Sequence, residues 1–338
     1  MNIIERAYKK IKRQTVGIVD QSMGLAGLYD KAYKQARGNR ILIYHGICKE
    51  DHTKFNPIFL TKKTFENHLG FYKKYFNVLS LDDFFWQRFS IDKFNVCLTF
   101  DDGLANNYDY VLPLLKKYEV PATFFVTGIR DAGYDILWND FLNIITHYGP
   151  QQLSYKGESY TRNEFGRYIS DKTGIALADS LRSTGFLEKK EMMDELSRLV
   201  DFKKNIADRD YWLQMTEEQI REMSASPWAD IGCHGYYHND LAKISIAGAK
   251  DEMIRSKHYL QNITGQEVKA LAFPYGSYSE EVKAEAKDLG FTQLLTMEFN
   301  DDADYADPVM RERLTLNPLI PVHAQMQATI KGNYDRWK

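Results

Sequence analysis

The hydrophobic positions of the chain follow two patterns that alternate along its first 130 residues. Short apolar runs rich in β-branched and aromatic residues, such as ILIYH (41–45), NVCLTF (95–100) and PATFFVTG (121–128), predict buried strands. Between them, as in 61–76, apolar residues recur about every 3.6 positions, which predicts helices. Strands that alternate with helices indicate parallel β/α units, so the expected fold class is α/β.

The same alternation returns after about residue 215. Further strands are expected at ADIGCH (229–234), VKALAFPYG (268–276), FTQLLTM (291–297) and RERLTLNPLI (311–320). In parallel sheets and barrels, functional residues gather where the strands end, at the carboxyl edge. Polar residues that directly follow a predicted strand are therefore the candidates for chemistry.

Residues 133–210 interrupt this pattern with few strand-like runs and a charged helical stretch, LEKKEMMDELSRLVDFKK. We expect a largely helical insertion within a catalytic domain that spans 41–338. Because the insertion follows a predicted strand, it should emerge at the carboxyl edge and act as a cap that narrows the site. The alternative is a solvated excursion that packs on the side of the domain and touches no substrate.

Residues 1–40 read as an N-terminal helical extension. Apolar residues at helical spacing are interleaved there with basic ones, namely Ile4, Ala7, Tyr8 and Ile11 with Lys9, Lys10, Lys12 and Arg13. Two interpretations stay open: a terminal helix that docks on its own domain, or an interfacial helix that lies on an anionic membrane surface.

Charge and cysteine content narrow the function classes. The chain has 338 residues and a net charge of -2, from 44 Lys and Arg against 46 Asp and Glu, so its charge gives no reason to expect nucleic-acid binding. Its three cysteines have no close pairing and fit a reducing compartment. No apolar signal segment and no run of about 18 apolar residues occurs, so we expect a soluble protein in the cytoplasm or at the inner membrane surface.

Two carboxylates stand side by side in TFDDG (99–103), directly after a predicted strand. Asp101 and Asp102 repel each other when both are ionised, so their adjacency near a core needs a compensating interaction. The Asp-Gly step alone reads as an ordinary turn. A bound cation would relieve the repulsion, with one aspartate as its ligand and the other left free as a base.

His234 and His238 lie four residues apart at the end of the predicted strand 229–234. On a helical turn or loop, two such imidazoles can share one face and bind one ion, although packing histidines at that spacing are common. Together with a carboxylate they suit a divalent cation, zinc first, with cobalt, nickel or iron as alternatives.

The sequence Pro274-Tyr275-Gly276 follows another predicted strand. Its loop can direct backbone N–H groups into the site, where such donors stabilise a developing oxyanion. An ordinary β–α turn is the alternative.

These motifs, in this order, resemble those of the NodB-homology polysaccharide deacetylases, carbohydrate esterase family four, over about 41–316. The resemblance implies a distorted (β/α) barrel that hydrolyses N-acetyl groups on amino sugars. By motif position, the implied roles are Asp101 as general base; Asp102, His234 and His238 as metal ligands; Tyr275, through its N–H, as oxyanion donor; and Pro274 and Gly276 as substrate-binding loop residues.

The chain departs from the family pattern at two places. Many members carry an Arg shortly before the Pro-Tyr motif, where this chain has Ala270 and Ala272; Arg313 or Arg311 on the last strand is the candidate replacement. Many also carry the general-acid His late in the chain, and RERLTLNPLI has none. The branch that acts on β-1,6-linked poly-N-acetylglucosamine is more similar, because its acid His ends the first strand, as His45 does here. His45 is therefore the candidate acid, with a capping role as the alternative.

The expected function is metal-dependent hydrolysis of an N-acetyl group on an amino sugar, in a glycan or a precursor of capsule or lipopolysaccharide. Two alternatives remain: an inactive protein that keeps its metal and binds glycans, and a metal-dependent amidase with a non-sugar substrate. The expected partner is an N-acetylated sugar, with no nucleic acid, and with membrane-surface contact through the N-terminal helix as an open possibility.

Overall fold

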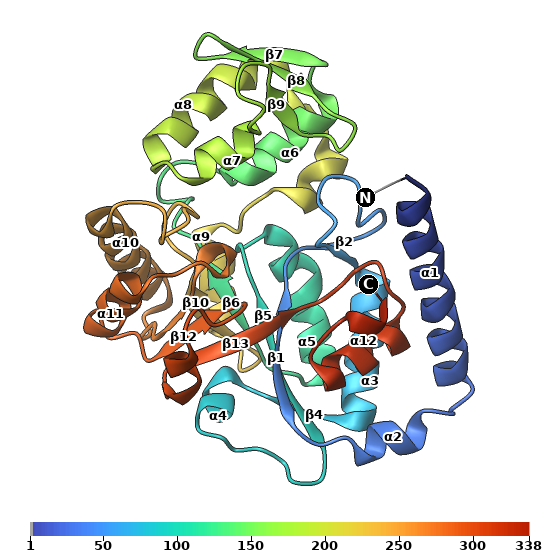
Figure 1. Ribbon diagram of the computed structural model, residues 1–338. Helices are drawn as coiled ribbons and strands as arrows, with labels where there is room; N and C mark the ends of the chain where they lie inside the picture. Colours follow the sequence, from blue (N-terminus) through green and yellow to red (C-terminus); the bar gives the residue numbers. More distant parts are fainter. Residues whose placement is uncertain (1–2, 338) are drawn as a thin grey trace.

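The computed structural model describes residues 3–337, with the backbone alone for residues 3–13 (Figure 1). Seven parallel strands form a closed ring in the order β1 (Asn39–Tyr44), β13 (Met310–Thr315), β12 (Gln293–Thr296), β11 (Ala270–Ala272), β10 (Ala229–Cys233), β6 (Ala122–Val126) and β5 (Phe94–Phe100). The ring closes because β1 pairs with both β13 and β5. This is the distorted (β/α) barrel that the resemblance implied, so the predicted fold class is confirmed.

The barrel is irregular at β5. One edge of this strand pairs with β1, while the other pairs with β4 (Phe76–Leu79) through 94–97 and with β6 through 98–100. All seven residues of β5 are buried, as expected for a parallel strand covered on both faces. The Asp-Asp pair therefore follows a fully buried strand.

Helices cover the outside of the barrel. They are α3 (Lys62–Tyr75), α4 (Leu81–Phe85), α5 (Leu112–Tyr118), α9 (Glu217–Ser224), α10 (Ile246–Thr264), α11 (Glu280–Asp288) and α12 (Val322–Lys331). Several begin after a Ser or Thr whose hydroxyl accepts a backbone N–H of the first turn, as Thr216 does in the capping box of α9. Two short strands, β2 (Ile47–Cys48) and β3 (Leu60–Thr61), and a π-helical turn, η1 (Asn107–Val111), complete this part of the chain.

Apolar side chains fill the lower part of the barrel interior. The cluster consists of Ile41, Cys97, Phe125, Ala270, Ala272 and Leu295 from the strands, closed by Leu81 and Phe84 of α4. The guanidinium of Arg313 lies over the Phe125 ring, 5.3 Å from its centroid. The polar residues of the carboxyl edge therefore lie on top of this apolar layer.

The insertion between β6 and α9 forms a separate body above the barrel (Figure 1). It contains α6 (Trp138–Tyr148), β7 (Gln152–Tyr155), β8 (Glu158–Arg162), β9 (Tyr168–Ser170), α7 (Leu177–Arg182), α8 (Phe186–Leu196) and the 3-10 turns η2 (Ser197–Leu199), η3 (Phe202–Lys204) and η4 (Ile206–Tyr211). It has its own hydrophobic cluster, built around residues such as Phe141, Met192 and Trp212.

The antiparallel sheet β7–β8–β9 was not predicted from the sequence. Its buried positions, Leu153, Tyr155 and Tyr160, alternate with exposed polar residues, and tyrosines made the segment read as polar. Lys156 and Gly157 both have positive φ, 50° and 75°, which forms the tight hairpin turn between β7 and β8.

The N-terminal extension forms α1 (Ile3–Leu25) and α2 (Asp30–Gln35). Helix α1 packs against α12 and against the 3-10 turn η7 (Asp335–Trp337) at the other end of the chain. The side chains of Ile4, Ala7, Tyr8, Ile11 and the basic residues among them lie outside the described residues. Within residues 3–337, no helix is long and apolar enough to span a membrane.

Candidate active site

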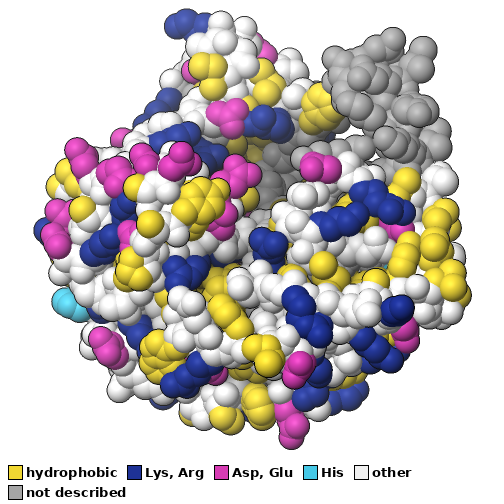
Figure 2. Space-filling view, turned by 60° about the horizontal axis from the view of Figure 1, so that its bottom comes forward, with side chains coloured by type: hydrophobic (Ala, Val, Ile, Leu, Met, Phe, Trp, Pro, Cys, Tyr) yellow, Lys and Arg dark blue, Asp and Glu magenta, His cyan; other side chains and the backbone are white. Residues whose placement is uncertain are grey.

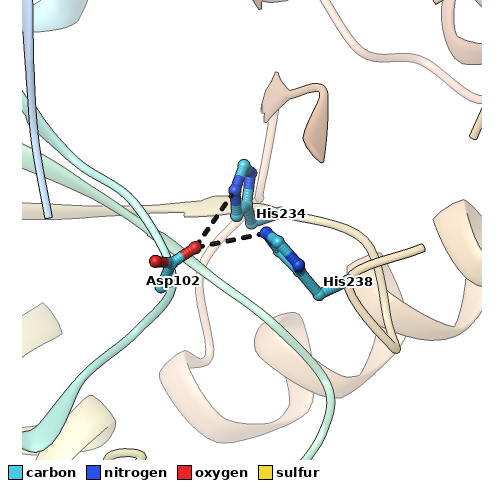
Figure 3. A group of neighbouring side chains, drawn as sticks. All are labelled: Asp102, His234 and His238. Carbon is cyan, nitrogen blue, oxygen red and sulfur yellow. Dashed lines mark ion pairs between the residues drawn. The ribbon is translucent and has the colours of Figure 1, made fainter. Parts of the chain in front are cut away.

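Three buried side chains converge at the carboxyl edge of the barrel. Asp102 Oδ1 lies 3.2 Å from His238 Nε2 and 3.6 Å from His234 Nε2, as Figure 3 shows. One ligand atom from each residue lies within 4.8 Å of the other two. Two imidazole nitrogens and one carboxylate oxygen at this separation suit a single divalent cation with an open coordination position.

A local contact prepares His234 as a ligand. The Nδ1 of His234 lies 2.8 Å from the Ala272 carbonyl, which fixes the proton on Nδ1 and leaves the Nε2 lone pair directed at Asp102. Burial lowers the pKa of His234 to about 4, so the ring stays neutral at ordinary pH. The predicted pair of residues is therefore brought together with Asp102, in a loop after β10 rather than on a helical turn.

Backbone strain gathers in this site. Asp102, His238 and Tyr275 adopt left-handed φ values of 76°, 57° and 62°, a conformation that side-chain-bearing residues rarely adopt. Gly103 also has a positive φ, and a Cβ atom there would lie 2.9 Å from Val126 Cγ1. The Asp-Gly turn expected from the sequence is therefore present, and its conformation directs the carboxylate of Asp102 toward the two histidines.

Asp101 forms a buried bidentate ion pair with Arg313. Nη1 of Arg313 donates to Oδ1 at 2.7 Å and Nη2 donates to Oδ2 at 2.8 Å, while Nη1 also donates to Thr99 Oγ1 at 3.1 Å. Burial alone would raise the pKa of Asp101, but the charge of Arg313 and its hydrogen bonds to the carboxylate outweigh burial, so the pKa is lowered. Asp101 Oδ2 lies 3.9 Å from His234 Nε2, at the edge of the ligand triad.

The two candidate arginines of the last strand have different positions. Arg313 faces Asp101, whereas Arg311 stacks on Phe85 and donates to the Met310 carbonyl at 2.6 Å. Arg311 lines a cavity formed by the amino ends of β1 and β13, away from the ligand triad.

A cavity of about 360 Å³ opens above the triad. Its walls are Ile43, His45, Asn56, Ile58, Asp101, Asp102, Asn139, Arg182, His234, His238, Tyr275, Gly276, Met297, Arg313 and Thr315. His45 lies at the end of β1, and its carbonyl accepts a hydrogen bond from Asn107 Nδ2 at 3.1 Å. His45, the Asp101–Asp102 pair and the His234–His238 pair therefore all line this one cavity.

The Pro-Tyr-Gly segment forms a 3-10 turn, η5 (Pro274–Gly276), at the rim of this cavity. The Tyr275 ring packs against His238, with 4.8 Å between the ring centroids. No described residue accepts a hydrogen bond from the Tyr275 N–H, whereas the next two N–H groups bond to Phe273 and Pro274. Gly276 lines the cavity and Pro274 packs behind it against Gly235.

The insertion contributes residues that sequence reasoning did not identify. Asn139 and Arg182 line the cavity, and the guanidinium of Arg182 lies 4.4 Å from the Tyr275 ring centroid. Asp140 is buried beneath them, and burial together with the charge of Asp102 raises its pKa well above the usual range. No motif marks these three residues, because the insertion folds independently of the barrel pattern.

The insertion also holds the loop that carries the histidines. Trp138 Nε1 donates to the His238 carbonyl at 3.3 Å, Arg182 Nε donates to Asp240 at 2.7 Å, and the Phe186 ring stacks on Tyr237 at 4.1 Å. From the barrel side, Glu252 of α10 accepts the backbone N–H groups of Tyr236 and Tyr237 at 3.1 and 3.0 Å. The His234–His238 loop is thus clamped between the insertion and α10.

Comparison with protein-family models identifies the relatives of this chain. Residues 90–155 and 181–294, more than half of the chain, match the model described as polysaccharide deacetylase. The unmatched segment 156–180 lies in the insertion. The curated relative YxkH of Bacillus subtilis, named as a polysaccharide deacetylase, is 22% identical over 262 residues, which cover 76% of this chain and 64% of YxkH. The chain therefore spans less than two thirds of that relative's length.

Solved structures show the same fold. The Streptococcus pyogenes deacetylase PplD, in complex with acetate, superimposes with a TM-score of 0.53 at 19% identity, covering 87% of this chain and 99% of PplD. IcaB from Ammonifex degensii gives a TM-score of 0.50 at 18% identity, covering 88% of this chain and 98% of IcaB.

Proposed function

This chain belongs to the polysaccharide deacetylase family, and from that premise we propose that it is a metal-dependent N-deacetylase of an amino sugar in a glycan or glycan precursor. Family membership supports deacetylation of a glycan. The observation that carries the finer proposal is the buried triad of Asp102, His234 and His238 with the Asp101–Arg313 pair beside it. The reaction adds water across the amide, so that the sugar nitrogen leaves as an amine and the acetyl group as acetate.

The donor set fits a divalent cation, zinc first. The three ligand atoms converge, both histidines are buried, and the tautomer of His234 leaves its Nε2 free. When bound, such a cation polarises the acetyl carbonyl and lowers the pKa of a water molecule. Cobalt, nickel and iron accept the same ligands.

The residues around the triad supply the proton transfers. We assign Asp101 as the general base, because Arg313 keeps it ionised and its Oδ2 lies at the edge of the triad. The Tyr275 N–H, which has no partner among the described residues, would donate to the oxyanion of the tetrahedral intermediate. His45, which lines the same cavity, would protonate the leaving amine.

We propose that the insertion is a cap rather than a free excursion, because Asn139 and Arg182 line the cavity. A volume of about 360 Å³ suits one or two sugar residues or a chain end. We further propose a cytoplasmic location, supported by the three cysteines, which are buried and free. A precursor such as a nucleotide-linked or lipid-linked N-acetyl sugar would be the substrate there.

Acetate release with zinc restored tests the function. Short chito-oligosaccharides, β-1,6-linked N-acetylglucosamine oligomers and a nucleotide-linked N-acetyl sugar should be compared, and at least one should release acetate. Asp101→Asn should lower turnover by about 100- to 10,000-fold, the usual contribution of a general base, with zinc content unchanged. Substantial activity in zinc-loaded Asp101→Asn would refute the base assignment. Absence of acetate from all three sugars would favour a binding protein or a non-sugar amidase.

A further inference from the structure

Helix α1 presents an apolar face that nothing in the described chain covers. Four residues on it and just after it are solvent-exposed, namely Ile18 (63% exposed), Val19 (45%), Leu25 (74%) and Leu28 (66%). Figure 2 shows hydrophobic side chains gathered on the right of that view, on the side where Figure 1 places α1. We call Ile18, Val19, Leu25 and Leu28 the α1 face.

The opposite side of α1 is firmly docked on its own domain. Asp20 is fully buried and accepts hydrogen bonds from Tyr29 Oη at 2.8 Å, Arg336 Nη2 at 2.8 Å and Trp337 Nε1 at 3.1 Å. A Cβ atom on Gly24 would lie 2.1 Å from the His323 ring, so only glycine permits this approach. The helix is therefore held in a fixed orientation, and the α1 face points outward because of it.

In the sequence, the seven-residue spacing of apolar residues extends toward the N-terminus, to residues whose side chains are not described. In the sequence, Ile4, Ile11, Ile18 and Leu25 recur every seven residues. A helix that only needed to dock on its domain would have polar residues at the outward positions.

The net charge of the N-terminal segment indicates which kind of partner the α1 face binds. The first 37 residues hold eight Lys and Arg against three Asp and Glu, a net charge of +5, whereas the whole chain has a net charge of -2. Two of these three acidic side chains already accept hydrogen bonds within the protein: Asp20 as described above, and Asp30 from Tyr75 Oη at 2.5 Å. After the α1 face, Lys31, Lys34 and Arg37 are exposed and form no ion pair within residues 14–337.

We propose that the α1 face and these basic residues bind the surface of an anionic lipid bilayer. An exposed apolar stripe beside clustered Lys and Arg is the pattern of a helix that lies in the membrane interface, with its apolar side chains among the acyl chains and its cations among the headgroups. A second copy of the chain fits the face less well, because two segments of net charge +5 would repel each other. The bilayer would bring the enzyme to lipid-linked or membrane-proximal substrates, but the binding itself does not depend on catalysis.

Vesicle flotation with the full chain tests the proposal. The protein should float with vesicles of phosphatidylethanolamine and phosphatidylglycerol, remain unbound with phosphatidylcholine alone, and release as salt is raised. The double variant Ile18→Gln with Leu25→Gln should bind the anionic vesicles on the order of tenfold more weakly. The matched control, Ile175→Gln with Leu187→Gln, replaces two similarly exposed residues of the insertion and should bind as the parent does.

Three results would overturn the proposal. The first is equal vesicle binding by the parent and the Ile18/Leu25 variant, and the second is no binding by either at low salt. The third is self-association of the parent in sedimentation that disappears in this variant, without any vesicle binding, which would make a second copy the occupant. Unchanged thermal unfolding of the variant shows that α1 is still docked, and acetate release measured in parallel keeps the proposed function separate.

Discussion

At the scale of single residues, the buried Asp101 shows how two adjacent carboxylates can share a core. Each aspartate has its own compensating partner: Arg313 for Asp101 and the two histidines for Asp102. The two pairs are built from different strands, since Asp101 follows β5 and Arg313 lies on β13. The two carboxylates are therefore adjacent in the chain but have different electrostatic surroundings.

Arg313→Lys tests whether the bidentate geometry matters for turnover. A lysine keeps the positive charge but offers no planar fork, so Asp101 would lose one of its two fixed hydrogen bonds and its orientation. We expect kcat to fall by about 10- to 100-fold with KM nearly unchanged, because misplacing a reacting group by a fraction of an ångström carries a cost of this order. Steady-state acetate release measures both constants.

The matched control is Arg311→Lys, two positions earlier on the same strand and directed away from the site. It should keep kcat within about twofold, as surface changes usually do. An equal loss in both variants would mean that β13 itself is disturbed, and the role of Arg313 would then have to be withdrawn.

The residue roles differ in how far sequence could predict them. Asp101, Asp102, His234 and His238 each follow a strand, so their meeting at one edge follows from parallel β/α topology. The choice between Arg311 and Arg313 could not be made, because both lie on the same face of β13 and the choice depends on their position along the strand relative to Asp101. Arg182 had no signal at all, since its position depends on how an independent insertion sits on the barrel.

At the scale of elements, the insertion and the His234–His238 loop act as one assembly. The loop has little regular structure of its own, and it is held by Trp138, Arg182 and Phe186 from the insertion and by Glu252 from α10. Metal ligands keep their geometry only when the surrounding residues fix them. The insertion therefore supports the proposed metal ligands as well as the shape of the cavity.

Phe186→Ala tests this coupling. The ring of Phe186 is nearly parallel to that of Tyr237, at 10° and 4.1 Å, and its loss should loosen the histidine loop. We expect the zinc Kd to rise by about three- to tenfold, corresponding to the usual value of one aromatic pair. Competition with a chromophoric chelator measures the Kd, and Leu187→Ala, an exposed neighbour on the same helix, serves as the control. Equal affinities in both variants would show that the barrel alone shapes the site.

Element prediction was strongest where the pattern was periodic. The strands of the barrel and the helices between them follow the apolar repeats in the sequence, although the predicted strands 268–276 and 311–320 end four and five residues too late. The sheet β7–β8–β9 was missed because three strands of alternating tyrosines and polar residues do not form an apolar run. Its stability comes from packing on α6 and α8, which a local pattern does not contain.

At the scale of the whole molecule, stability should depend on pH through a histidine that takes no part in the proposed reaction. His68 of α3 is buried in the main core, where its Nδ1 lies 3.1 Å from Tyr44 Oη. Burial lowers the pKa of His68 from its usual 6.5 to about 3. Between these two values the unfolded chain binds a proton that the folded protein refuses, so the free energy of unfolding falls as the pH is lowered from about 6.5 toward 3.

Denaturant unfolding of the zinc-free protein at pH 7 and pH 4.5 measures this effect. His68→Leu should lose about 2–3 kcal/mol less stability across that interval than the parent does, since two pH steps in the window correspond to that amount. His258→Leu, at an exposed position, should leave the pH dependence as it is in the parent. Identical pH profiles for His68→Leu and the parent would exclude His68 as the source.

The closure of the barrel has a consequence for the order in which the protein is made. Strand β13 is the last to leave the ribosome, yet it pairs with β1, the first strand of the ring, and carries the partner of Asp101. At about 5–20 residues per second, tens of seconds separate the synthesis of these two strands. During that interval the growing chain has one open edge on β1 and an unpaired carboxylate after β5. Until β13 has been made and has paired with β1, the proposed catalytic residues are therefore incomplete and the open edge of β1 exposes the chain to misassembly.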